Sequence, residues 1–190
     1  MITEIQKQKQ ILRQKFYSQS LTLPNNIYRK KASNIICKNL QSTSFFKDAK
    51  TVLLYYPSKE EVNITSIIEN YFSEKDKHIY LPSTSRLSIT QVSRDTPLKI
   101  SFNSIKEPVY PNHKLPQKLN LAVIPGIFFD KQGFRLGHGK GWYDQLLCKV
   151  VFDTIVGLSF EKMIVKKLPI EDHDKKVDFI ITEKRIIDCR

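Results

Sequence analysis

The sequence predicts an α/β domain of three layers, with a largely parallel, Rossmann-like central sheet between two layers of helices. Short apolar segments alternate along the chain with segments of helical apolar spacing, as they do in strand–helix–strand units. The apolar segments lack polar alternation, which indicates strands covered on both faces of the sheet. No internal repeat, low-complexity tract or linker divides the chain, so we take residues 1–190 as a single domain.

Helices are expected over residues 2–20, 24–40 and 61–72, and directly after a glycine-rich stretch near residue 140. The first segment carries apolar residues at roughly helical spacing among lysines and glutamines. The second begins at a proline followed by two asparagines, a pattern that favours a helix start. One helical face of the last segment collects four apolar residues: Tyr143, Leu146, Leu147 and Val150.

The predicted strands are short and mostly apolar. They are expected over residues 51–57, 78–82, 87–92, 119–126, 154–160 and 177–182. The segment 96–116 is rich in proline and polar residues, and it is predicted to be a long loop. Because ligands of such folds bind at the carboxyl ends of the strands, the stretch after residue 126 is a candidate site.

Charge and composition narrow the class of partner. Lysine and arginine outnumber the acidic residues 31 to 19, and the net charge of +12 favours anionic partners. The lysines are scattered and no zinc-finger, RRM or KH signature is present, so nucleic acid is not the expected partner. No apolar run is long enough to span a membrane, and the N-terminus lacks a hydrophobic signal core. The three cysteines are not spaced as a CxxC pair or as metal ligands, which indicates reduced thiols. We expect the protein to be cytoplasmic and monomeric.

The stretch RLGHGKGWYD, residues 135–144, concentrates the candidate chemistry. Its three alternating glycines can turn backbone N–H groups toward one point and form an anion-binding nest before a helix. Arg135 and Lys140 supply positive charge, and the aromatic pair 142–143 offers flat surfaces. The stretch matches neither GxxxxGK[ST] nor GxGxxG. The residues alone therefore indicate an anion-binding turn, with a glycine-rich surface loop as the alternative.

The longer stretch PGIFFDKQGFRLGHGKGWYD, residues 125–144, closely resembles the signature of the 5-formyltetrahydrofolate cyclo-ligases, also called 5,10-methenyltetrahydrofolate synthetases. Shorter similarities follow in the family's order, so that the resemblance spans nearly the whole chain: Lys9 to Arg13, Tyr56 to Val62, Glu107-Pro108 and Asp174 to Asp178.

This chain departs from the family pattern at two places. The family often has an arginine shortly after the first of these segments, where this chain has Ser18, Gln19 and Ser20. It also often has a basic residue after the proline that ends the second strand, where Ser83 follows Pro82 and an arginine comes only at residue 86. Neither departure touches the glycine-rich stretch.

The resemblance implies an enzyme that uses ATP and Mg²⁺ to convert 5-formyltetrahydrofolate, including its polyglutamylated forms, to 5,10-methenyltetrahydrofolate. The implied reaction phosphorylates the formyl oxygen, closes the ring through N10 and releases ADP and phosphate. Phosphoryl transfer needs positioning and charge neutralisation more than a protein nucleophile, so no covalent catalytic residue is expected. Alternatives are a related ATP-dependent enzyme with another anionic substrate, or a basic nucleic-acid-binding protein.

The resemblance also implies the roles of individual residues. The catalytic pair that stabilises phosphate charge is Arg135 and Lys140, and the metal ligands are Asp144 and Asp174. The ATP contacts are Lys9, Gln10, Ile11, Leu12, Arg13, Arg135, Leu136, Gly137, His138, Gly139, Lys140, Gly141, Trp142 and Tyr143. The folate contacts are Tyr56, Glu61, His138, Gly139, Lys140, Gly141 and Trp142.

Several of these residues also have a plain structural interpretation. Lys9 and Arg13 lie four apart on one helical face, where they suit a solvated basic surface as well as a triphosphate. Glu61 suits a helix cap, and Asp144 suits the dipole of the helix that it opens. Tyr56 is equally a core aromatic, and His138 is expected to contribute only its backbone. His173, next to Asp174, suits the surface of a polar loop.

Overall fold

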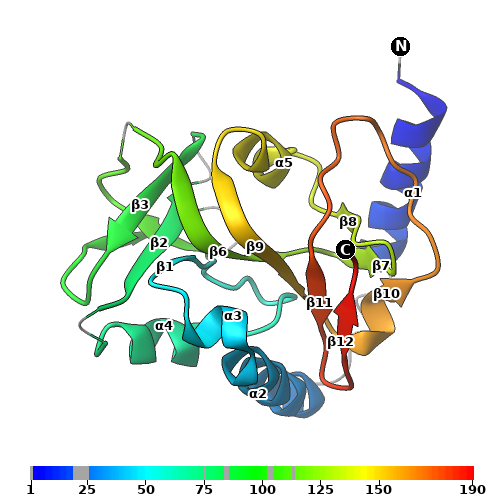
Figure 1. Ribbon diagram of the computed structural model, residues 1–190. Coiled ribbons are helices and arrows are strands. Elements are labelled where there is room, and N and C mark those ends of the chain that lie inside the picture. The colour runs from blue at the N-terminus through cyan, green and yellow to red at the C-terminus, as the bar shows by residue number, and fades with distance from the viewer. Residues whose placement is uncertain (1, 19–25, 75, 84–85, 102–104, 113) are drawn as a thin grey trace.

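The computed structural model describes residues 2–18, 26–74, 76–83, 86–101, 105–112 and 114–190, which form a sheet flanked by helices (Figure 1). The strands of the sheet are β1 (Thr51–Leu53), β2 (His78–Ser83), β3 (Ser88–Val92), β6 (Lys118–Pro125), β9 (Val151–Leu158), β11 (Phe179–Ile181) and β12 (Ile186–Asp188). Within the described ranges, they form a seven-stranded sheet in the order β12-β11-β9-β6-β1-β2-β3.

The pairing confirms the predicted α/β class with a largely parallel sheet. Strands β11, β9, β6, β1 and β2 are mutually parallel along this order. Strands β12 and β3 pair antiparallel at the two edges. The β6–β9 ladder is long, and its register runs from Lys118 opposite Val151 to Pro125 opposite Leu158. Because parallel strands end at the same edge, the carboxyl ends of β1, β2 and β6 lie together.

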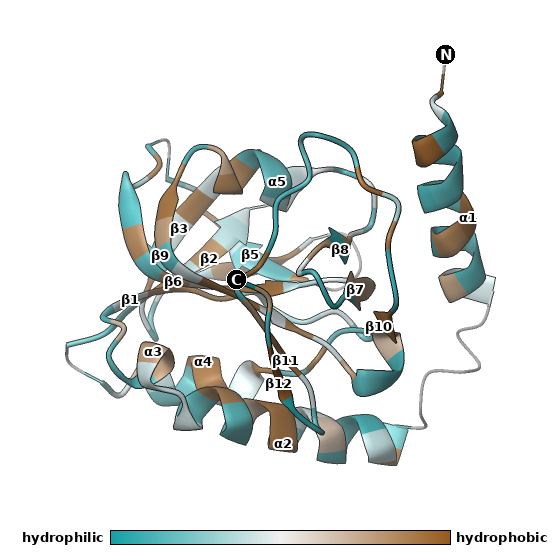
Figure 2. Cartoon of the chain, turned by 45° about the vertical axis from the view of Figure 1, so that its right-hand side comes forward, coloured by the Kyte–Doolittle hydropathy of each residue, from teal (hydrophilic) through white to brown (hydrophobic). Residues whose placement is uncertain are grey.

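Helices cover both faces of the sheet. On one face lie α2 (Asn26–Ser42), α3 (Ser44–Lys47) and α4 (Thr65–Tyr71), and on the other lies α5 (Trp142–Leu147) (Figure 1). Successive residues of each strand enter opposite layers: Leu121 packs in the α2 layer and Ala122 in the α5 layer. In Figure 2 the central strands are mostly brown, whereas α1 (Glu4–Ser18) alternates brown and teal turns. This confirms the expectation of strands covered on both faces.

Helix α1 stands beside a second, smaller sheet at one end of the molecule (Figures 1 and 2). That sheet consists of β7 (Phe128–Asp130), β8 (Arg135–Leu136) and β10 (Ile164–Val165), with β7 in the middle. A 3-10 turn over Glu161–Met163 precedes β10. The ring of Phe16 packs edge-on against Phe128, with centroids 6.0 Å apart. The sheet brings the glycine-rich stretch next to α1.

The predicted start of one helix and the prediction of one long loop are wrong. Residues 61–64 are not helical, because α4 begins at Thr65, whose backbone N–H donates to the side chain of Asn63. Glu61 is therefore not a helix cap. The segment 96–116 is not all loop, since it contains a hairpin of β4 (Leu98–Ile100) and β5 (Lys106–Pro108). Each strand has only three residues; β4 is largely exposed, and β5 is Lys-Glu-Pro with its last two residues buried, so neither shows the apolar pattern that would predict a strand.

The remaining predicted elements occur with shifted ends. The strand expected over 51–57 ends at residue 53, and the one expected over 154–160 begins at residue 151. The predicted C-terminal end of the first helix and the predicted start of the second fall on residues 19–25, outside the described ranges. In the part of the chain that the structure describes, no helix has the length and apolar character needed to cross a membrane.

Candidate active site

A cavity of about 480 Å³ opens at the carboxyl ends of β1, β2 and β6. Four parts of the chain line it: the inner face of α1, the loop after β1, the stretch 135–144 and the segment 171–174. The end of β6 contributes Pro125 and Gly126, and β2 contributes Pro82. The cavity therefore lies at the strand ends where the sequence predicts a ligand site.

The glycines of the stretch 135–144 have backbone conformations that favour glycine. Gly139 has a φ of +102° and Gly141 a φ of +60°, both in the left-handed region. A Cβ at residue 139 would also lie 3.4 Å from Cζ of Arg13, so α1 packs closely against this turn. Gly141 is the N-cap of α5, which is only six residues long. Charge for an anion must therefore come mainly from side chains rather than from this helix.

Arg135 is a buried cation with unused donors. Its side chain is 4% exposed, and its guanidinium lies 5.4 Å from the ring centroid of Tyr143. Its Nη2 lies 3.0 Å from Oδ1 of Asp144, close enough for an ion pair but not aligned as a hydrogen bond. Among the described residues, Nε and Nη2 of Arg135 have no hydrogen-bond partner. Because Nη2 is ion-paired with Asp144, Nε is the donor with neither kind of partner among the described residues, and a buried donor left unpaired costs about 1–3 kcal/mol.

The two predicted cations of α1 are held by ion pairs and hydrogen bonds. Nζ of Lys9 lies 2.9 Å from Oε2 of Glu171 and 2.6 Å from Oδ2 of Asp174. Nε of Arg13 donates to the carbonyl of Gly137 at 2.8 Å. The interpretation of Lys9 as part of a solvated basic face is wrong, because its side chain is 8% exposed. The hydrogen bond from Lys9 holds the pKa of Glu171 below its ordinary value of 4.5.

Carboxylates from two segments reach the same end of the cavity. Asp144 accepts the backbone N–H of Lys175, and Asp174 accepts the backbone N–H of Glu171. The ligand atoms of Glu171, His173 and Asp174 lie within 4.8 Å of one another. Hard carboxylate oxygens beside a phosphate site suit Mg²⁺, which is usually held by one or two carboxylates and several waters. Among the described residues, the clustered ligand atoms belong to Glu171, His173 and Asp174; Asp144 is not part of that cluster, so its place among the metal ligands stays a prediction.

A further part of the cavity lining is aromatic and carries one carboxylate. Oε2 of Glu61 accepts the backbone N–H of Ser58 at 2.8 Å. The ring of Trp142 donates its N–H to the carbonyl of Arg86. Tyr56 is partly buried, and the ammonium of Lys106 lies 5.1 Å from its ring centroid. Burial raises the pKa of the neighbouring Tyr55 and of Tyr143. These phenols therefore stay neutral at physiological pH.

The side chain of His138 makes two contacts within the protein, while its backbone-only role toward a ligand stays a prediction. Its Nδ1 lies 2.6 Å from the hydroxyl of Tyr17 on α1. Its Nε2 lies 3.7 Å from Oε1 of Glu61. Burial, with the nearby carboxylates of Glu60 and Glu61, raises the pKa of Tyr17, so the hydroxyl keeps its proton. The imidazole thus connects the first helix to the loop after β1.

The structure brings nearly all of the predicted site residues to this one cavity. Gln10, Ile11 and Leu12 do not line it, and Ile11 is 61% exposed on the outer side of α1. The cavity-lining residues that the sequence interpretation did not assign to the site are Gln6, Tyr17, Tyr55, Pro82, Ile105, Pro125, Gly126 and Glu171. His173, predicted as surface, is 65% exposed and lies at the cavity. The spacing 6, 9, 13, 17 on α1 is the signal that could have found Gln6 and Tyr17.

At the end of a largely parallel sheet, this α/β protein has a cavity whose buried arginine, carboxylates and aromatic side chains suit an anionic, ring-bearing ligand. Over residues 5–183 the chain matches the 5-formyltetrahydrofolate cyclo-ligase family, and it belongs to that family. Its activity is therefore that of a 5-formyltetrahydrofolate cyclo-ligase, which is an ATP-dependent ligase of one-carbon metabolism.

Similar proteins support this membership. A probable 5-formyltetrahydrofolate cyclo-ligase of Schizosaccharomyces pombe is 28% identical over 172 residues, which covers 80% of this chain and 84% of the relative. The 5-formyltetrahydrofolate cyclo-ligase of Haemophilus influenzae is 31% identical over 137 residues, covering 67% and 73%. The structure of a 5,10-methenyltetrahydrofolate synthetase of Aquifex aeolicus matches with a TM-score of 0.82 at 33% identity, covering 96% of this chain and 93% of that one.

Proposed function

We propose that this chain converts 5-formyltetrahydrofolate to 5,10-methenyltetrahydrofolate with ATP and Mg²⁺, releasing ADP and phosphate. The observation that carries the proposal is Arg135, a buried cation whose Nε and Nη2 have no hydrogen-bond partner among the described residues. It faces the same cavity as Glu61 and the aromatic side chains. One cavity therefore offers a phosphate site and a ring site side by side.

The phosphate end of the cavity consists of Lys9, Arg13, Arg135, Asp144 and Asp174, with the exposed Lys140 at its border. A buried arginine is fixed in place and can grip a phosphate at two oxygens. A lysine acts instead as a mobile point charge. Together they would neutralise the negative charge of the transferred phosphoryl group, which is the main demand of this chemistry.

Asp144 and Asp174 would hold Mg²⁺ in this arrangement. When bound, the ion supplies positive charge between phosphate oxygens and orients them. Lys9 contacts Oδ2 of Asp174, so this lysine stands within reach of both the carboxylate and a phosphate.

The folate end of the cavity consists of Tyr55, Tyr56, Glu61, Trp142 and Tyr143. The carboxylate of Glu61 would accept hydrogen bonds from pterin N–H groups, while the rings stack on the pterin. The formyl oxygen would then attack the terminal phosphorus of ATP, breaking its bond to ADP. Attack of N10 on the formyl carbon would close the ring and expel phosphate, with loss of the N10 proton. The side chains position both substrates for these steps.

The test supplies the purified protein with 5-formyltetrahydrofolate, Mg²⁺ and ATP and follows the near-ultraviolet absorbance of the methenyl product. Formation of product together with equimolar ADP is the expected result. ATP binding without product would contradict the proposal and favour a related ATP-dependent enzyme with another anionic substrate. Salt-sensitive binding of DNA or RNA without ATP binding would instead favour a nucleic-acid-binding protein.

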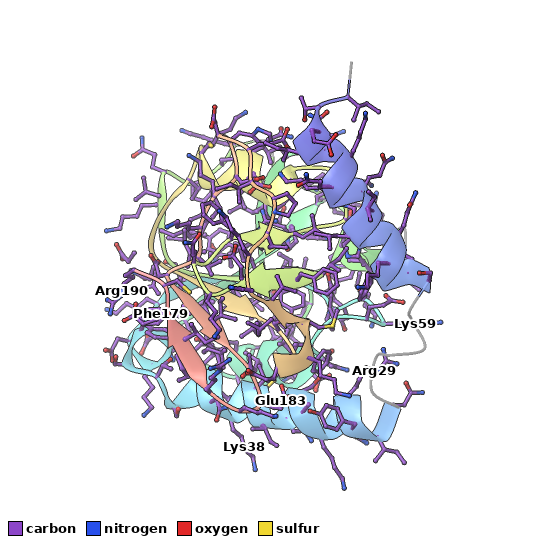
Figure 3. The ribbon with its side chains drawn as sticks, turned by 90° about the vertical axis from the view of Figure 1, so that its right-hand side faces the viewer. Arg29, Lys38, Lys59, Phe179, Glu183 and Arg190 are labelled. Carbon is purple, nitrogen blue, oxygen red and sulfur yellow. The ribbon has the colours of Figure 1, made fainter. Side chains whose placement is uncertain are left out.

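Lys140→Ala tests the phosphate end within the same assay. We expect turnover to fall by about 100-fold, because a charge on the transferred group loses its partner. Lys38→Ala is the matched control, since Lys38 points outward from α2, away from α1 (Figure 3). Wild-type turnover in Lys140→Ala would contradict the role assigned to this lysine.

A further inference from the structure

Asp130 is part of the PGIFFD motif, yet the proposed chemistry gives it no role. It ends β7 and is completely buried, at 0% exposed. Among the described residues it makes no ion pair with a lysine or arginine. A carboxylate in such a position must find hydrogen-bond donors to replace the water that it loses.

Backbone N–H groups supply those donors, and they come from two parts of the chain. Oδ1 of Asp130 accepts from Gln132 at 2.9 Å and from Phe134 at 3.1 Å, which closes the turn between β7 and β8. Oδ2 accepts from Leu168 at 3.0 Å, a buried residue 38 positions further along the chain. One oxygen therefore shapes a local turn, and the other holds a distant segment.

The distant segment is residues 168–177, which contain no helix or strand. The same turn holds its other end, because the backbone N–H of Val177 donates to the carbonyl of Gly133 at 2.9 Å. Between these two attachments lie Glu171 and Asp174, whose carboxylates meet Lys9, and Lys175, whose backbone N–H donates to Asp144. In Figure 1 this segment is the orange loop that rises from β10 and returns to β11.

We infer that Asp130 is a positioning residue, whose Oδ2 fixes residues 168–177 so that Glu171 and Asp174 face the phosphate end of the cavity. The attachment at Leu168 lies only three residues before Glu171, so its loss would let both carboxylates move. The consequence for ATP and Mg²⁺ rests on the proposed function, whereas the attachment itself does not.

Asp130→Asn tests the inference with little change of volume. An amide has one acceptor oxygen and one NH₂ group, so it cannot accept at both positions. The orientation that keeps both local hydrogen bonds turns the NH₂ group toward the N–H of Leu168 and breaks that contact. We expect hydrogen exchange of the amides of residues 168–174 to accelerate by about 10-fold, while exchange in β6 stays unchanged.

Activity assays of the same variant separate positioning from general damage. We expect the KM for ATP at limiting Mg²⁺ to rise by about 10-fold and the KM for 5-formyltetrahydrofolate to change less than about 2-fold. Asp153→Asn is the matched control, because Asp153 lies near the amino end of β9 and pairs with Lys118 on the surface. It should leave the exchange rates of residues 168–174 and both KM values as they are.

Two results would overturn the inference. One is unchanged exchange of residues 168–174 in Asp130→Asn, and the other is an equal rise of both KM values. If the variant does not fold, the wild-type amide of Leu168 decides, since a buried hydrogen bond to Asp130 makes its exchange slower than that of the unbonded amides of exposed loops. Exchange of that amide as rapid as in exposed loops would refute the contact. Wild-type protein that makes no methenyl product would refute the proposed function, while the exchange measurements would still judge Asp130.

Discussion

The phosphate end and the folate end of the cavity differ in the side chains that line them: the first is mostly charged and the second mostly aromatic. At the phosphate end, cations and carboxylates already contact one another, as Lys9 does with Asp174 and Arg135 with Asp144. At the folate end, Glu61 shares the cavity lining with aromatic side chains; its Oε2 accepts the backbone N–H of Ser58, and its Oε1 lies 3.7 Å from Nε2 of His138. A ligand must therefore displace existing ion pairs at the phosphate end and pack against aromatic rings at the folate end. Charge changes should then affect turnover with ATP at the first end and folate affinity at the second.

Arg135→Lys should have the largest effect, because it keeps the charge and removes the planar fork that can bind two phosphate oxygens. We expect kcat to fall by about 100- to 1000-fold, with the KM for 5-formyltetrahydrofolate nearly unchanged. Steady-state kinetics of product formation measure both. Arg94→Lys, at an exposed position outside the cavity, is the control. A kcat within about 3-fold of wild type would remove Arg135 from the proposed phosphate site.

Asp174→Asn should raise the Mg²⁺ concentration needed for half-maximal activity by about 10-fold or more, because a neutral amide is a poor ligand for this ion. The readout is a titration of Mg²⁺ at saturating substrates. Asp172→Asn, two residues away and exposed, provides a matched control outside the cavity. An unchanged Mg²⁺ requirement would mean that Asp174 serves only to neutralise Lys9.

Glu61→Gln should act at the other end. We expect the KM for 5-formyltetrahydrofolate to rise by about 10-fold, since one charge-assisted hydrogen bond is worth about 1.5–3 kcal/mol. The KM for ATP should stay within about 2-fold. Glu60→Gln is the neighbouring control, because Glu60 does not line the main cavity. Equal changes in the two KM values would break the division of the cavity into two ends.

The pH dependence of Glu171 should give the smallest effect. The hydrogen bond from Lys9 lowers the pKa of Glu171 in the folded protein. A lowered folded pKa stabilises the protein above the ordinary value of 4.5, and that contribution is lost as pH falls through the folded pKa. We expect Glu171→Gln to lower Tm by about 2–4 °C at pH 7. The difference should shrink below pH about 4.5, as thermal unfolding across pH would show. A difference that grows on acidification would contradict this sign.

Sequence by itself determined the class of the fold, the glycine-rich stretch and the family. These features are local in the sequence. The apolar pattern that marks a strand or a helix is recognisable within about ten residues. The resemblance to the family rests mainly on residues 125–144, which are contiguous in the chain. The pair Lys9 and Arg13 on one helical face is equally local, since helical spacing alone places it. The left-handed Gly139 and Gly141 agree with the prediction that this turn needs glycine.

Only the tertiary structure decided which partners these residues meet. Lys9 finds its carboxylates 162 and 165 residues away, and no local period predicts such a pair. The hydrogen bond from Leu168 to Asp130 and the contact of His138 with Tyr17 likewise join residues far apart in the sequence. Such contacts depend on how loops at one sheet edge pack together and on the rotation of α1 about its axis. Both are set by the burial of surfaces far apart in the chain, which a single sequence does not display.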